Sequence, residues 1–213
     1  MSGRLCFGRA FLNAKNRQDE DMHTIYDCVN SFCSLLDTQY HLVLGRKGVA
    51  VELYIRFGEK DCFHLMGLQY LTDMPNLSRD RGKIFHEIRE KKITQKQVES
   101  SDHYHKIAGR IELLPHLEDL FDSNDTVFKY NARMNAFSMI QADYLMKNRI
   151  QDKNVFLFLA KGRETEYYFC RSFFPEGKMD YTKNQASWTL LYKKKTRLST
   201  GEEKVLYDRL NKN

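Results

Sequence analysis

The chain has 213 residues, of which 42% are apolar and 29% charged, a composition that excludes global disorder and fits a globular protein with one sizeable core. No run approaches the roughly 18 consecutive apolar residues of a membrane span, and residues 1–22 lack the hydrophobic region of a secretory signal. The five cysteines form no C-x-x-C pair, which argues against a disulfide framework and a zinc knuckle. We therefore expect a cytoplasmic protein without a membrane segment.

Positive charge is concentrated towards the C-terminal end. The chain holds 34 Lys and Arg against 28 Asp and Glu, a net charge of +6, and residues 151–213 alone hold thirteen basic and eight acidic residues, a balance of +5. Basic segments attract polyanions. This part of the chain is therefore where we look for contact with phosphate groups.

The first half of the chain predicts helices and one hairpin. Apolar residues at helical spacing predict an amphipathic helix over residues 21–40. Alternating apolar and polar residues over 41–57, interrupted at 45–48 by Gly-Arg-Lys-Gly, predict a β-hairpin with a basic tip. An acidic start and a following proline predict a further helix over residues 61–71, with His64 in its first turn.

The second half changes from helical to strand-like patterns. Residues 79–122 predict two or three helices, after which five aromatic and β-branched runs predict successive strands. Helices followed by strands favour an α+β fold, in which N-terminal helices and a hairpin pack on a C-terminal antiparallel sheet of four to five strands. We expect residues 1–213 to form one domain, with 1–19 as a poorly ordered arm and 79–122 as a helical insertion.

His64 is the first candidate for chemistry, within the run FHLMGLQYL. A histidine between Phe63 and Leu65 is commonly a hydrogen-bonded core residue. A helix N-terminus would attract a phosphate, however, and Gly67 would leave room for a close approach to the helix. An imidazole is also the natural proton carrier near neutral pH, so both interpretations stay open.

Arg171 interrupts the aromatic run YYFCRSFFP. Strict alternation would place Arg171 and Ser172 on opposite faces of a strand, so only a β-bulge or the strand end would let both line one site. The guanidinium either binds an anion or extends from an apolar edge to water.

Further donors follow in the segment DYTKNQASWTLLYKKK. The candidate substrate-binding residues are the aromatic and donor side chains of this segment and the basic hairpin tip, namely Tyr181, Lys183, Gln185, Lys193, Arg46 and Lys47. Thr182 supplies a hydroxyl, and such groups beside aromatic rings suit ribose, phosphate and a stacked base. The three consecutive lysines at 193–195 also fit a solvated strand end.

Several common catalytic signatures are missing from the sequence. It contains no Gly-rich phosphate loop, serine nucleophile elbow, H-E-x-x-H motif or paired-carboxylate signature. The histidines at 103, 105 and 116 have no cysteine or carboxylate at a ligand spacing. We therefore predict no cofactor and no metal site.

Five segments in order resemble a nuclease family. They are FHLMGLQYLTDMP, IELLPHLEDLFDS, FSMIQADYLM, CRSFFPEGKMDYTKNQ and TLLYKKK. Together they resemble the phage-type Barnase/EndoU/colicin/RelE-like nucleases of phages and mobile elements of Gram-positive bacteria, over about residues 20–210.

The resemblance implies an RNase-like fold and metal-independent cleavage of RNA by attack of the ribose 2′-hydroxyl. It implies an acid or base role for His64, charge neutralisation by Arg171, and hydrogen bonding to substrate by Ser172, Thr182 and Gln185. The second acid/base partner stays open among Tyr181, Lys183, Glu52 and Glu59. One imidazole, one guanidinium and a few donors suffice for such chemistry.

Three hypotheses follow. The first is an endoribonuclease acting on single-stranded or transfer RNA, a toxin or conflict protein with a cognate inhibitor. The second is a non-catalytic module that binds RNA or a host protein. In the third, His64 is a core residue and the positive charge is incidental.

Overall fold

The computed structural model describes residues 23–78, 80–123, 126–135 and 138–211, so the predicted arm at residues 1–19 lies outside the described part. The strands are β1 (Thr38–Arg46), β2 (Val49–Ile55), β3 (Thr126–Lys129), β4 (Tyr144–Ile150), β5 (Lys153–Lys161), β6 (Tyr167–Pro175), β7 (Ala186–Arg197) and β8 (Glu203–Asp208). The α-helices are α2 (Ile25–Leu36), α3 (Glu59–Met66), α4 (Arg81–Arg89), α5 (Gln95–Glu99), α6 (Ala108–Leu113) and α7 (Leu117–Asp122).

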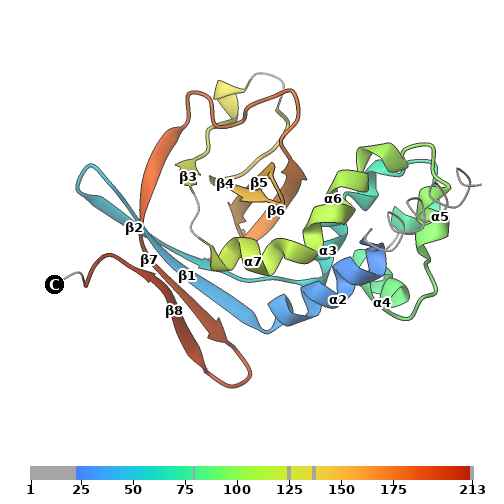
Figure 1. Ribbon diagram of the computed structural model, residues 1–213, viewed down its shortest axis with the longest axis horizontal. Helices are drawn as coiled ribbons and strands as arrows, with labels where there is room; N and C mark the ends of the chain where they lie inside the picture. The colour runs from blue at the N-terminus through green and yellow to red at the C-terminus, as the bar shows by residue number, and fades with distance from the viewer. Residues whose placement is uncertain (1–22, 79, 124–125, 136–137, 212–213) are drawn as a thin grey trace, which may run out of the picture.

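The strands form one closed sheet rather than an open one. Their order is β1-β2-β6-β5-β4-β3-β7-β8, and β1 pairs with β7 as well as with β2. This additional pairing closes seven of the described strands into a barrel, with β8 as an extra strand on β7 (Figure 1). The α+β class is confirmed, but the prediction of a four- to five-stranded antiparallel sheet is wrong.

The closure depends on pairings between distant parts of the chain. Tyr40 of β1 lies opposite Lys195 of β7, and β2 pairs in parallel with the start of β6 through Tyr54 and Tyr167. Local hydrophobic alternation identifies a strand but not its partner. The hairpin therefore joins the sheet that we expected it to cover.

Local sequence explains several element boundaries. Thr24 caps α2 in a reciprocal capping box with Asp27. At the β1–β2 turn, Lys47 and Gly48 both have positive φ angles, of 50° and 78°, which is the geometry of a two-residue hairpin turn. The predicted hairpin with its basic tip is thus confirmed.

The segment 79–122 is divided more finely than predicted. Its described residues form α4, α5, α6 and α7, with short 3-10 turns at Tyr104–Lys106 and Leu114–His116. Pro115 lies inside the second turn and interrupts the helical hydrogen bonding. Helical periodicity continues across such turns, so the pattern predicts fewer and longer helices. None of the helices among the described residues is long and apolar enough to cross a bilayer.

Two apolar clusters occupy the two faces of strands β4 to β6. The larger one joins these strands to the helices and to β1 and β2, and it includes Phe121 of α7, which stacks on Tyr40 of β1 at 4.9 Å. In Figure 1, α7 lies between β4–β6 and β1. The smaller cluster contains Phe156 and Phe158 and is packed against Tyr181 and Phe174. The larger cluster fixes α3 beside β6, and both elements carry candidate site residues.

Candidate active site on helix α3 and strand β6

His64 lies in the last turn of α3, so its predicted place in the first turn is wrong. Gly58 is the N-cap residue of this helix, and Gly67 ends it in the left-handed conformation with a φ of 82°. Glycine adopts this conformation without steric cost and commonly ends a helix. The amides at the N-terminus of α3 therefore do not draw a phosphate towards His64.

The His64 ring accepts a hydrogen bond from an arginine. Nη1 of Arg81, the first residue of α4, lies 2.6 Å from Nε2 of His64. A guanidinium can only donate, so Nε2 is the acceptor and the neutral ring carries its proton on Nδ1. Burial, together with the charges of Arg81 and Arg171, lowers the pKa of His64 from 6.5 to about 4. A partly exposed imidazole near two cations is thus uncharged at neutral pH.

The charge of Arg171 reaches His64 because α3 packs alongside β6. The pairing of β5 with β6 shifts at this point: Phe158 lies opposite Ser172, and Leu159 opposite Cys170. Arg171 is therefore the extra residue of a β-bulge. Cys170 and Phe173 are buried in the larger core, so the bulge leaves Arg171 and Ser172 on the face turned away from that core.

Arg171 also lines a cavity of about 460 Å³. Lys161 and Arg163 contribute two more cations to its wall, and Asp143 contributes a carboxylate. Nζ of Lys161 pairs with Glu166 at 2.7 Å, and Asp143 pairs with Lys129 at 3.7 Å. This positively charged cavity is thus lined by the same arginine whose charge lowers the pKa of His64.

Arg110 of α6 is a positioning residue that the sequence analysis missed. It is only 8% exposed, and its Nη1 donates to the carbonyl oxygen of Phe173 at 2.5 Å. Its guanidinium lies 5.2 Å from the ring centroid of Tyr70 and 5.0 Å from that of Phe174. Arg110 thus holds the backbone of β6 next to Arg171 and Ser172. A Cβ on Gly67 would lie 2.8 Å from Cδ of Arg110, so the space that we expected at Gly67 is filled by this arginine.

The loop before β7 contributes structural contacts. Gln185 accepts from the backbone amide of Asn131 and donates to its carbonyl oxygen, which joins two loops. Thr182 donates its hydroxyl to Asp180 at 2.6 Å, and Tyr181 packs on Phe158 at 5.4 Å. Lys183 is exposed. Tyr181 and Arg110 interact electrostatically, which connects this loop to the β6 region.

The two glutamates considered as partners for His64 pair with other histidines. Glu59 lies 3.0 Å from Nε2 of His86, and Glu52 lies 2.9 Å from Nε2 of His41. Arg81, rather than a carboxylate, contacts the His64 ring.

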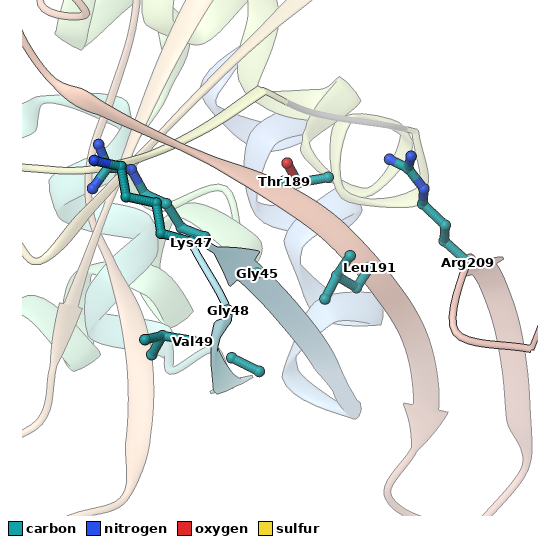
Figure 2. A pocket seen from close by; sticks show the side chains of 9 residues that line it. Gly45, Lys47, Gly48, Val49, Thr189, Leu191 and Arg209 are labelled. Atoms are coloured by element: carbon teal, nitrogen blue, oxygen red, sulfur yellow. The ribbon is translucent and has the colours of Figure 1, made fainter.

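A second basic region surrounds the hairpin tip. Arg46, Lys47 and Arg209 line a cavity of about 520 Å³ together with Thr189 of β7. Lys47 and Arg209 extend on either side of Thr189 (Figure 2). Within the part of the chain that the structure describes, no ion pair joins these three cations to a carboxylate. We call Arg46, Lys47 and Arg209 the open cationic pocket.

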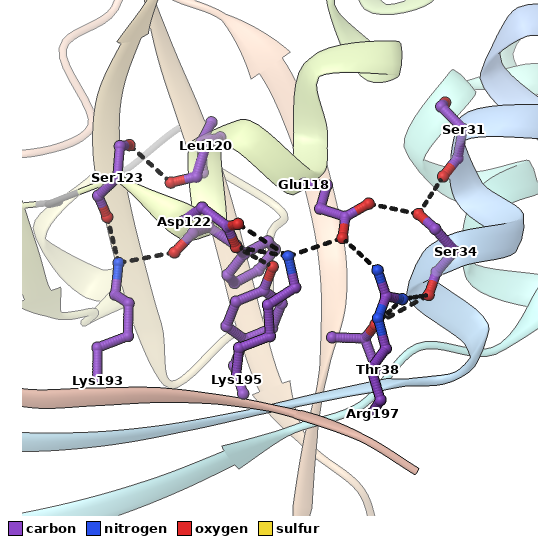
Figure 3. Close-up of polar contacts among 12 residues, drawn as sticks. Ser31, Ser34, Thr38, Glu118, Leu120, Asp122, Ser123, Lys193, Lys195 and Arg197 are labelled. Atoms are coloured by element: carbon purple, nitrogen blue, oxygen red, sulfur yellow. Dashed lines mark hydrogen bonds and ion pairs between the residues drawn. The ribbon is translucent and has the colours of Figure 1, made fainter. Parts of the chain in front are cut away.

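Two lysines of the run on β7, Lys193 and Lys195, face α7 instead. Lys193 is fully buried and donates to the carbonyl oxygens of Phe121 and Ser123 at the end of α7. Lys195 pairs with Asp122 at 2.8 Å and with Glu118 at 2.7 Å, and Arg197 pairs with Glu118 at 3.1 Å (Figure 3). We call Lys193, Lys195 and Arg197 the neutralised cluster. This placement does not fit a substrate-binding role for Lys193.

The described ranges contain no group of three or more His, Cys, Asp or Glu side chains arranged to hold a metal ion. What the α3–β6 region brings together is one neutral imidazole and the guanidinium groups of Arg81 and Arg171, and Ser172 follows Arg171 along β6. Guanidinium groups in this setting can hold a phosphate, and the imidazole can accept a proton.

A comparison with protein families identifies the family of the chain. Residues 24–210 match the family described as phage-Barnase-EndoU-ColicinE5/D-RelE like nuclease4, so the chain belongs to this family of phage-associated nuclease-like domains. The resemblance found in the sequence is thereby confirmed. No curated protein and no solved structure matches the chain.

Proposed function

We propose that the protein is an endoribonuclease that cleaves RNA by attack of a ribose 2′-hydroxyl on the adjacent phosphate. The observation that carries this proposal is the neutral His64 ring, which accepts a hydrogen bond from Arg81 and lies close enough to Arg171 for that charge to lower its pKa. The region thus combines a proton acceptor with two cations that can bind a phosphate. Membership of a nuclease family supports a nucleic-acid substrate. The need for a 2′-hydroxyl distinguishes RNA from DNA as the substrate.

His64 acts as the general base in this proposal. A group with a pKa of about 4 is uncharged at pH 7 and is ready to accept a proton. A phosphate bound between Arg81 and Arg171 draws the Arg81 guanidinium away from Nε2 and onto its own oxygens. The released lone pair then accepts the proton of the 2′-hydroxyl as the 2′-oxygen bonds to phosphorus, while Arg171 stabilises the charge that develops on the phosphate. The bond from phosphorus to the 5′-oxygen breaks, and the leaving 5′-oxygen takes a proton from water.

Residues around this centre position it. Ser172 offers a hydroxyl beside Arg171, and Arg110 fixes the β6 backbone through Phe173. Thr182 and Tyr181 belong to the loop that covers the neighbouring aromatic cluster. In the proposal, Ser172 contacts substrate, whereas Arg110 and Thr182 hold the surrounding backbone in place.

The proposal is tested with an end-labelled RNA oligonucleotide incubated in EDTA. We expect products with 2′,3′-cyclic phosphate ends and no cleavage where the reacting ribose carries a 2′-O-methyl group. His64→Ala and Arg171→Ala proteins should lose about 10²- to 10⁴-fold in rate. His86→Ala and Arg149→Ala serve as matched controls, because their side chains pair with Glu59 and Asp152 instead.

Full cleavage by folded His64→Ala protein would refute the proposal. RNA binding that is sensitive to salt but leads to no cleavage would instead support the non-catalytic module.

The biological setting follows from the family. We propose that the enzyme acts on cytoplasmic RNA, single-stranded or transfer RNA, in conflict between a phage or mobile element and its host. A protein inhibitor that blocks the α3–β6 region would restrain it. Induced expression should stop growth and fragment cellular RNA with the native protein, and should do neither with His64→Ala.

A further inference from the structure

A row of aromatic side chains crosses the outer face of three strands, next to a lysine on a fourth. In β1 the buried residues alternate with partly exposed ones, so His41 faces away from the core. The strand registers place Lys194, His41, Tyr54 and Tyr167 opposite one another on β7, β1, β2 and β6. Neighbouring strands lie about 4.8 Å apart. We call His41, Tyr54 and Tyr167 the aromatic row.

The rings of this row are held in place by polar contacts. The rings of His41 and Tyr54 stack with centroids 4.4 Å apart and planes at 6°. Both side chains hydrogen-bond Oε2 of Glu52 at 2.9 Å. The Arg56 guanidinium lies 3.8 Å above the Tyr167 ring, and its Nε donates to Gln39 at 2.8 Å. Such fixed rings lose little conformational entropy when a ligand binds.

A cavity opens beside the row. It has a volume of about 540 Å³ and is lined by Tyr54, Tyr167, Arg56, Gln39 and the turn at residues 164–166. Ring faces, a guanidinium, an amide and carboxylates are the groups that bind a nucleobase by stacking and by hydrogen bonds to its edge. The lining therefore fits one flat, polar aromatic ligand.

The cavity lies on the strand that also carries the candidate active site. Tyr167, Phe169 and Arg171 alternate with the inward-facing Tyr168 and Cys170 of β6, so they share one face. Four residues along a strand span about 13 Å. A nucleic acid held by its phosphate at Arg171 would thus extend along β6 to Tyr167.

We propose that the aromatic row and its cavity bind an unpaired base of the RNA substrate, next to the cleaved linkage. This inference rests on the proposed function and deepens it, because it assigns single-stranded rather than duplex RNA as the substrate. Bases in a duplex are stacked and paired, so their faces are not accessible to Tyr54 and Tyr167, whereas an unpaired base can stack there.

The test measures binding separately from cleavage. A fluorescent 2′-O-methyl RNA oligonucleotide lacks the attacking hydroxyl, and fluorescence anisotropy reports its affinity alone or annealed to its complement. We expect tighter binding of the single strand. Tyr167→Leu should weaken that binding about tenfold, the effect of losing one stacked base, and leave duplex binding unchanged. Tyr167→Phe keeps the ring and should bind like the native protein.

Tyr26 provides a matched control, because a cation also covers its ring, with Nζ of Lys91 4.7 Å from the centroid. Tyr26→Leu should bind like the native protein. Tyr54→Leu is the second variant should Tyr167→Leu fold poorly. An abasic residue introduced at successive positions should abolish the effect of Tyr167→Leu at one position near the cleaved linkage.

Equal loss of single-strand and duplex binding, or no loss in either variant, would overturn the inference. The two proposals fail in different ways. Preserved single-strand binding without cleavage of ordinary RNA would remove the proposed function and keep the binding site. Cleavage of single strands and duplexes at equal rates, with no effect of Tyr167→Leu, would remove the binding site and keep the proposed function.

Discussion

The open cationic pocket and the neutralised cluster both involve β7, yet their basic side chains have different surroundings. Lys193, Lys195 and Arg197 point towards α7. There Lys193 donates hydrogen bonds to backbone carbonyl oxygens, and the other two side chains pair with the carboxylates of Glu118 and Asp122. Arg46, Lys47 and Arg209 surround a cavity near Thr189, and no carboxylate pairs with them within the described residues. A run of lysines therefore indicates a phosphate site only where no other group already balances its charge.

Lys193→Ala should have the largest effect on stability. The substitution leaves the carbonyl oxygens of Phe121 and Ser123 without a buried ammonium donor and should lower the free energy of unfolding by about 3 kcal/mol. Lys47→Ala, at the exposed hairpin tip, should change it by less than about 0.5 kcal/mol. Urea unfolding of both proteins measures the difference. Equal effects would contradict the distinction between the neutralised cluster and the open cationic pocket.

Glu118→Gln should have an intermediate effect. Glu118 forms ion pairs with Lys195 and Arg197 and accepts a hydrogen bond from the Ser34 hydroxyl at 2.5 Å. Loss of its charge leaves two cations with fewer partners and should cost about 1–2 kcal/mol. Glu203→Gln is the control, because Glu203 pairs with Lys194 on the exposed face of the same strand. A smaller loss for Glu118→Gln than for the control would contradict the assigned role of the neutralised cluster.

The carboxylate of Glu118 should also contribute to the pH dependence of stability. Burial works to raise the pKa of Glu118, but hydrogen bonds from Lys195 and Ser34 outweigh it, and the pKa lies below its ordinary value of 4.5. A lowered folded-state pKa contributes stability above the ordinary value and loses it as the pH falls through the folded-state value. The stability difference between native and Glu118→Gln proteins should therefore shrink at acidic pH in urea titrations. A difference that grows on acidification would exclude this sign.

Substitutions in the open cationic pocket should have the smallest effect, and they should change RNA binding alone. Replacing Arg46, Lys47 and Arg209 together by Gln should reduce the slope of log affinity against log salt by about 2, since each phosphate contact on a single strand contributes about 0.7. The control replaces Lys83, Arg149 and Lys153, whose cations already pair with carboxylates. An equal reduction in the control would show that the pocket is not special.

The sequence predicted individual helices and strands better than it predicted which strands pair. Helical spacing predicted α2, and alternation around Gly-Arg-Lys-Gly predicted the β1–β2 hairpin. The closure of the barrel was not predictable, because Tyr40 and Lys195 meet from distant parts of the chain. Alternation also shows that Lys193 and Lys194 face opposite ways, but only the pairing with β1 decides which of them is buried.

For the candidate site, the sequence suggested residue types but not their geometry. His64 and Arg171 do interact electrostatically, as Arg171 contributes to the pKa of His64. Arg81 was missed because it reaches His64 from a different helix, and no local pattern joins the two. Arg110 left a detectable signal: with Ile107, Ile111 and Leu114 it occupies i, i+3, i+4 and i+7 positions of one buried helical stripe. A charged residue within such a stripe indicates a structural or functional contact.

The most direct test of the central claim, that neutral His64 is the base, is the pH dependence of kcat/KM for RNA cleavage. This quantity reports groups of the free enzyme. We expect the rate to fall at acidic pH with a midpoint near 4, because burial, Arg81 and Arg171 lower the pKa of His64. Arg81→Gln should move the midpoint towards 6.5, since it removes one of those charges. A midpoint that stays near 4 in Arg81→Gln, or that persists in an active His64→Ala protein, would contradict the account.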